Sequence, residues 1–180
     1  MKFFIDTTGQ NLALAIFDEN YFLIDFLVEN VFNKADLLPS YVKKILNKNS
    51  LKINQIQDFY LNLGPGMFTG CRVALVFTRT IAQLNKVNIY TTNSFALSSF
   101  LNKNEDIYYI STSSKYAFQA SAKNGKITSK ISEVNNPSLK ASKIDYFLIF
   151  NSFYLASLIF KKELNLLKIK PLYIKEPTIG

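Results

Sequence analysis

The amino-acid sequence predicts an α/β protein built from two copies of one unit, the second of them shortened. Two observations lead to this prediction. Segments with strand and helix patterns follow one another in a set order along the first half, and the same opening order returns in the second half. The hydrophobic content of 48% is high enough for a large buried core.

The first half contains the clearer copy of the unit. Apolar runs place strands at 2–8, 11–17, 21–28, 59–63 and 87–91, and apolar residues at helical spacing place helices at 34–47, 69–84 and 93–101. A short polar turn at 18–20 joins the second and third strands, and Pro39 should kink or delay the first turns of the first helix. Three strands followed by alternating helices and strands is the order of a ribonuclease-H-like unit.

The second half begins in the same way. Strands are expected at 107–112, 116–122, 126–131 and 145–150, and a helix near 152–162. Asn124-Gly125 is the strongest hairpin signal of the chain. A charged break at 102–106 divides the chain into predicted domains at 1–102 and 103–180. Two such halves form the duplicated ribonuclease-H-like plan of the actin/hexokinase-type ATPase superfamily, in which ATP lies in the cleft between them.

Composition excludes several classes of function. Histidine is absent and Cys71 is the single cysteine, which excludes Ser-His and Cys-His pairs, histidine metal sites and an intrachain disulfide, so we expect no metal site. The net charge of +8 fits either a solvated basic surface or modest RNA affinity. No apolar run approaches the ~18–20 residues that span a bilayer, and the first residues lack a signal peptide's apolar stretch, so we expect a cytoplasmic protein without a membrane partner.

A glycine-rich turn leads from the fourth strand into the second helix. Gly64 and Gly66 flank Pro65 in a tight loop, Thr69 can cap the helix, and Gly70 allows another backbone to approach closely. A strand-to-helix turn of this kind is also a plausible anion cradle. The motif residues are Gly64, Pro65, Gly66, Phe68, Thr69, Gly70 and Arg72.

The stretch LGPGMFTGCRV at 63–73 resembles the GPGSFTGLR signature of the TsaB (YeaZ) family, with Met67 and Cys71 in place of the usual serine and leucine. The start FIDTT at 4–8 is similar to the family's IDTS, the segment 33–39 keeps only the LLP of HSExLLP, and 170–177 is similar to its PxYLR-type tail. The resemblance covers 2–101, fades across 103–165, and returns at 170–177.

The resemblance implies a pseudo-enzyme without catalytic residues of its own. TsaB-like proteins share the fold of the catalytic subunit TsaD and bind it through their N-terminal domains. With the ATPase TsaE they support the transfer of threonylcarbamoyl to N6 of a tRNA adenosine, the modification called t6A. We therefore expect TsaD-like and TsaE-like partners, tRNA reached through the complex, and no cofactor bound by this chain, with ATP and Mg²⁺ only at the assembled complex.

Asp6, Thr7 and Thr8 correspond to the phosphate hairpin of superfamily ATPases, which place a carboxylate near magnesium at the position of Asp6. Here Asp6 either caps the turn structurally or is a vestigial ligand. Arg72 either bonds to its own domain or belongs to a partner interface. Cys71 is either a small buried hydrophobe or a thiol whose pKa a helix N-terminus lowers.

Helices 69–84 and 37–46 carry apolar surfaces wider than one face. We predict that they dock a TsaD-like partner, or a second copy when the partner is missing; two-sided packing within the domain is the alternative. The interface residues predicted here are Val73, Val76, Phe77, Thr80, Ile81, Leu84, Leu38 and Tyr41.

Two other functions compete with the partner-subunit hypothesis. A small-molecule kinase or ATPase of the same superfamily would need a second acidic hairpin, but 111–115 offers none, and no two glycines are adjacent. A ribonuclease-H-like nuclease would need several carboxylates around two metal ions. Only Asp6, Asp25 and Asp58 lie on or beside the predicted central strands.

Overall fold

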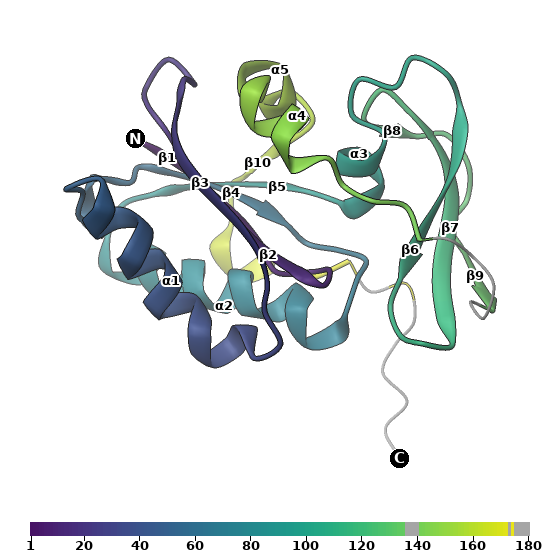
Figure 1. Ribbon diagram of the computed structural model, residues 1–180, viewed down its shortest axis with the longest axis horizontal. Helices are drawn as coiled ribbons and strands as arrows, with labels where there is room; N and C mark the ends of the chain where they lie inside the picture. The colour runs from purple at the N-terminus through teal and green to yellow at the C-terminus, as the bar shows by residue number, and fades with distance from the viewer. Residues whose placement is uncertain (136–140, 173, 175–180) are drawn as a thin grey trace.

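The computed structural model describes residues 1–135, 141–172 and 174, and contains two sheets (Figure 1). The larger sheet has the order β10-β5-β4-β1-β2-β3. Its strands are β1 (Lys2–Asp6), β2 (Asn11–Phe17), β3 (Leu23–Asn30), β4 (Asp58–Asn62), β5 (Asn88–Thr92) and β10 (Lys161–Glu163). Strands β1, β4 and β5 are parallel, whereas β2, β3 and β10 run antiparallel to their neighbours.

Helices cover both faces of this sheet. Helices α1 (Lys34–Lys48) and α2 (Phe68–Leu84) lie on one face, and α4 (Tyr146–Asn151) and α5 (Phe153–Ser157) lie on the other (Figure 1). Side chains of a strand alternate between faces, so Phe3 and Ile5 join the core under α1 and α2, while Phe4 joins the core under α4 and α5. This two-sided cover explains why all of β1 is buried.

The smaller sheet belongs to the second half. Its strands are β6 (Asp106–Ser111), β7 (Tyr116–Lys123), β8 (Lys126–Ile127) and β9 (Ser132–Asn135), with β7 pairing with all three others. The short helix α3 (Ser94–Ser98) packs on this sheet, and its Phe95 is fully buried against Tyr108 and Ala120. Two 3-10 turns lie at Ile53–Gln55 and Leu166–Lys168.

The predicted strand at 145–150 is wrong, because this segment forms helix α4. The Asp145 carboxylate accepts a hydrogen bond of 2.9 Å from the backbone N–H of Leu148 and so caps the helix. Ile149, Phe150 and Phe153 are buried at helical spacing. The run of apolar residues is therefore a helix lying on the larger sheet rather than a strand within it.

Other predicted boundaries in the second half also change. The strand expected at 126–131 is limited to two residues, since the Ser129 hydroxyl accepts the Ser121 N–H (2.8 Å) where a strand would offer a carbonyl. An unexpected strand, β9, follows. The helix expected near 152–162 divides into α5 and β10, and the helix expected at 93–101 is shortened to α3.

The chain returns to the larger sheet after building the smaller one. Strand β10 pairs with β5, with Lys161 opposite Thr91, and α4 and α5 lie on the first half's strands. Elements of the predicted segment 103–180 thus complete the core of the first half. The limits 1–102 and 103–180 stay a prediction about domains. None of the helices among the described residues is long and apolar enough to cross a membrane.

Candidate functional site

The glycine-rich loop between β4 and α2 interlocks with the turn between β1 and β2. The N–H of Met67 donates to the carbonyl oxygen of Thr8 (2.7 Å), and the hydroxyl of Thr7 donates to the carbonyl oxygen of Gly70 (2.5 Å). The same Thr7 oxygen accepts the N–H of Ala74 (3.3 Å). Two loops far apart in the sequence therefore form one hydrogen-bonded unit.

Glycine is required at two of these contacts. A Cβ atom at Gly66 would lie 2.5 Å from the carbonyl oxygen of Thr8, and one at Gly70 would lie 2.2 Å from that of Thr7. The close backbone approach predicted for Gly70 is confirmed, and its partner is the β1–β2 turn. The prediction that Thr69 caps the helix is wrong, because α2 begins at Phe68 after Met67 and Thr69 already lies in its first turn.

Asp6 ends β1 beneath this unit and is completely buried. Its Oδ1 accepts hydrogen bonds from the N–H (2.8 Å) and the hydroxyl (2.7 Å) of Thr8. Its Oδ2 accepts hydrogen bonds from the amide of Asn62 (2.7 Å) and the hydroxyl of Tyr146 (2.8 Å). Both oxygens are thus occupied by protein donors, and the carboxylate offers no free position to a magnesium ion.

The environment of Asp6 explains the titration behaviour of its neighbour. Burial raises the pKa of Tyr146 well above its usual value, and the nearby Asp6 charge and the hydrogen bond to it raise it further. The phenol therefore stays protonated and remains a donor to Asp6. Tyr146 comes from α4, so this bond joins an element of the second half of the chain to β1.

Asn62 and Ser94 extend the network to the glycine-rich loop. The Asn62 side chain accepts the N–H of Gly64 (3.0 Å), and the Ser94 hydroxyl donates to the carbonyl oxygen of Pro65 (2.6 Å). Sequence reasoning missed Asn62, Ser94 and Tyr146. A polar Asn at the end of an apolar strand was a usable signal for Asn62. Tyr146 had no comparable signal, because its segment was predicted to be a strand.

A cleft of about 690 Å³ opens beside this network. It lies between the β1–β2 turn, the glycine-rich loop, the β6–β7 turn at 111–114 and the segment 141–144. Several residues with hydroxyl groups line it, including Thr8, Ser94, Thr112 and Ser142, together with apolar residues such as Met67 and Ile144. This is the position between the two halves that the superfamily resemblance assigned to a nucleotide.

The structure describes the surroundings of Arg72 and Cys71, and it decides between the alternatives for Cys71 alone. The Arg72 guanidinium lies 3.9 Å from the centre of the Phe68 ring, a cation–π contact within the first turns of α2. Cys71 is buried at 4% exposure, and burial raises the pKa of its thiol to about 12. Burial outweighs the helix N-terminus, so Cys71 is a small core residue rather than a reactive thiolate.

The predicted interface residues divide into three groups on α1 and α2. Leu38 has no exposure and lies in the core, so its assignment to the interface is corrected. Four others are partly buried against the same core: Tyr41, Val73, Phe77 and Ile81. Val76 (60% exposed), Leu84 (77% exposed) and Thr80 remain on the surface. The prediction of two-sided apolar helices thus applies to α2 more than to α1.

Comparison with protein families matches residues 33–126 to the family described as TsaD: tRNA N6-adenosine threonylcarbamoyltransferase. Among curated proteins, the uncharacterized protein MG208 homolog of Mycoplasma pneumoniae is 30% identical over 99 residues, which cover 53% of this chain and 50% of that protein. The uncharacterized protein MG208 of Mycoplasma genitalium is 32% identical over 96 residues, which cover 52% and 49%. The chain spans about half the length of the curated relatives it matches.

Two solved structures resemble the whole fold. YeaZ from Pseudomonas aeruginosa has a TM-score of 0.59 at 17% identity and covers 78% of this chain and 71% of its own. A crystal structure described as an uncharacterized protein with similarity to peptidase YEAZ from Pseudomonas aeruginosa has a TM-score of 0.65 at 14% identity, covering 97% and 99%. The predicted duplicated ribonuclease-H-like fold is confirmed.

Proposed function

The chain belongs to the TsaD family of tRNA N6-adenosine threonylcarbamoyltransferase, and we propose that within it this protein is a TsaB-like, non-catalytic subunit that binds and supports a TsaD-like catalytic subunit. Its fold is that of YeaZ proteins. The reaction served by the complex is the formation of t6A in tRNA. A TsaE-like ATPase is the further partner, tRNA is reached through the complex, and the cytoplasm is the proposed location.

The buried state of Asp6 carries this proposal. In an ATP-dependent enzyme of this fold, the corresponding carboxylate faces the cleft and holds the magnesium of the nucleotide. Here Asp6 is fully buried and accepts four hydrogen bonds, one of them from Tyr146. Losing them would leave a buried charge without partners, at a cost of several kcal/mol. We infer that Asp6 has a structural role, so we assign ATP and Mg²⁺ to the assembled complex rather than to this chain.

The exposed part of α2 is the proposed docking surface. Val76 and Leu84 are large apolar residues on the solvent side of a helix whose opposite side already fills the core. Association with an apolar partner surface would remove both from water, each worth roughly 1–2 kcal/mol. A second copy of this chain can cover the same surface when the partner is missing.

Co-purification tests this proposal. The chain is expressed with the TsaD-like protein of the same organism, with and without ATP, and the product is analysed by size exclusion with light scattering. We expect a stoichiometric complex, and no nucleotide bound by the isolated chain in equilibrium dialysis. Failure to associate contradicts the partner role, and nucleotide bound to the isolated chain would support the ATPase or kinase alternative.

Variants locate the docking surface. The double change Val76→Glu with Leu84→Glu should weaken the complex at least tenfold, because it places two charges in an apolar contact. Phe147→Glu is the matched control, since Phe147 is 68% exposed on α4, on the opposite face of the sheet. Equal complex formation by all three proteins would remove α2 from the interface. Circular dichroism checks that each variant is folded.

A further inference from the structure

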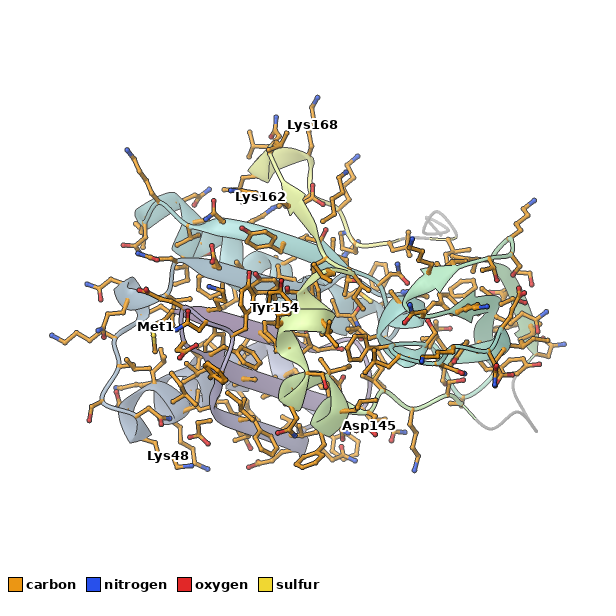
Figure 2. The ribbon with its side chains drawn as sticks, turned by 90° about the horizontal axis from the view of Figure 1, so that it is seen from above. Met1, Lys48, Asp145, Tyr154, Lys162 and Lys168 are labelled. Carbon is orange, nitrogen blue, oxygen red and sulfur yellow. The ribbon has the colours of Figure 1, made fainter. Side chains whose placement is uncertain are left out.

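The edge of the larger sheet at β10 carries a group of lysines. Strand β10 supplies Lys161 and Lys162, the following turn supplies Lys168 and Lys170, and Lys86 precedes β5 beside them. All five are exposed. Figure 2 shows Lys162 and Lys168 at one edge of the molecule. These five residues are called the lysine rim.

Among the residues that the structure describes, no ion pair neutralises the positive charge of the lysine rim. The two ion pairs found among the described residues join Lys2 to Asp58 and Lys48 to Asp25, so they leave the rim lysines unpaired. The single carboxylate within the rim segment is Glu163, which accepts the Thr91 hydroxyl (2.6 Å). The rim therefore presents a concentrated positive field to solvent.

The backbone beneath the lysine rim is held in place by three sets of hydrogen bonds. Strand β10 pairs with β5, the Arg79 guanidinium donates to the carbonyl oxygens of Leu166 (3.1 Å), Leu167 and Ile169, and the N–H of Leu172 donates to the carbonyl oxygen of Leu63 (2.9 Å). The lysines therefore project from an ordered support and not from a free tail. Because this backbone is already ordered, less backbone entropy is lost when the lysines meet a charged partner.

We propose that the lysine rim binds the phosphate backbone of RNA. Several unpaired lysines along an ordered segment match the regular negative charges of a nucleic acid and release its counterions on binding. This inference extends the proposed function, which would bring tRNA to the chain. The rim adjoins the C-terminal end of α2, because Arg79 of α2 bonds the backbone beneath the rim and Lys86 follows Leu84 by two positions. The contacts position the RNA and read no sequence.

The exposed Leu164 and Leu167 stand between the lysines and would also suit an acidic protein surface. The test therefore measures RNA and protein binding on the same variants. Binding of a fluorescently labelled tRNA transcript is followed by anisotropy at several salt concentrations. The double change Lys162→Gln with Lys168→Gln should weaken binding about tenfold at low salt and reduce the salt slope by about 1.5.

A matched control removes the same charge elsewhere. Lys123→Gln with Lys126→Gln alters two exposed lysines at the β7–β8 turn of the smaller sheet, and should change the affinity less than threefold. Unchanged binding by the rim variant, or an equal loss in the control, overturns the inference. Loss of the TsaD-like partner with unchanged RNA affinity assigns the rim to a protein instead. A rim variant that loses RNA affinity but keeps the TsaD-like partner supports both proposals. If the parent protein binds RNA but forms no complex with the TsaD-like protein, only the proposed function is contradicted.

Discussion

The hydrogen bonds around Asp6 show how the surroundings of a carboxylate determine its role. A carboxylate at the end of the first strand is where enzymes of this fold bind magnesium, yet here four protein donors surround it. Two of these donors, Asn62 and Tyr146, come from distant parts of the chain. A vestigial ligand would keep a carboxylate oxygen open to a metal ion, whereas a structural residue has both oxygens bonded to protein donors. The contacts of Asp6 favour the structural alternative.

Gly70 provides the sharpest test at the residue scale. In a helix, alanine is favoured over glycine by about 1 kcal/mol, so propensity predicts that Gly70→Ala stabilises α2. The new Cβ would lie 2.2 Å from the carbonyl oxygen of Thr7, which belongs to backbone and cannot move aside. We expect the clash to dominate and the free energy of unfolding to fall by about 3 kcal/mol in urea titrations.

Gly9→Ala is the control for this change. Within the described part of the chain, no atom lies within 4 Å of the place that a Cβ at Gly9 would take, although Gly9 lies in the same turn as the Thr7 carbonyl. Its unfolding free energy should stay within about 0.5 kcal/mol of the parent protein. A stabilised Gly70→Ala protein would show that the two loops do not pack as described.

At the scale of elements, α4 and α5 build the core on one face of the larger sheet. Phe4 packs edge-on against Phe150 (5.2 Å between ring centres), and Phe17 stacks on Phe153 (3.7 Å). These helices cover β1 and β2 and exclude water from that face of the sheet. Since apolar burial is the main favourable term in folding, this late segment of the chain stabilises the first strands of the sequence.

Two neighbouring phenylalanines of α4 test that conclusion. Phe150 is 1% exposed and Phe147 is 68% exposed on the same helix. Phe150→Ala should lower the free energy of unfolding by about 3–5 kcal/mol, because it removes a buried ring and leaves a cavity. Phe147→Ala should change it by less than about 1 kcal/mol. Similar losses for both, measured by urea unfolding, would argue against this orientation of α4.

At the scale of the whole molecule, two tyrosine phenols and one cysteine thiol are buried. We therefore predict that the folded protein loses stability at alkaline pH. Burial raises the pKa of Tyr146, of Tyr60 and of Cys71, the last to about 12. The unfolded chain ionises these groups at their ordinary pKa, near 8.5–10, while the folded chain keeps them protonated. The contribution of these protonated groups to the free energy of unfolding is thus complete below about pH 8, and it is lost as the pH rises.

Each such group makes the free energy of unfolding fall by about 1.4 kcal/mol per pH unit once its unfolded form has ionised. Lys34 acts in the opposite direction, because burial lowers its pKa and the unfolded chain then holds the extra proton. The net slope should still be negative between pH 9 and 11. Tyr146→Phe should make the slope above pH 10 shallower by about 1.4 kcal/mol per unit, and an identical slope in both proteins would contradict the assignment.

Local patterns in the sequence were sufficient for the strands of the first half, for α1 and α2, and for the glycine-rich loop, because periodicity and turn residues act over a few positions. They failed at 145–150, where FLIF suits a buried strand or a buried helix equally and only its contact with Phe4 and Phe17 selects the helix. They also placed Leu38 on an interface, since an apolar pattern does not reveal which side is covered. The bonds from Asn62 and Tyr146 to Asp6, and the Arg79 contacts under the lysine rim, join residues more than fifty positions apart, and such pairs exist only once the chain is folded.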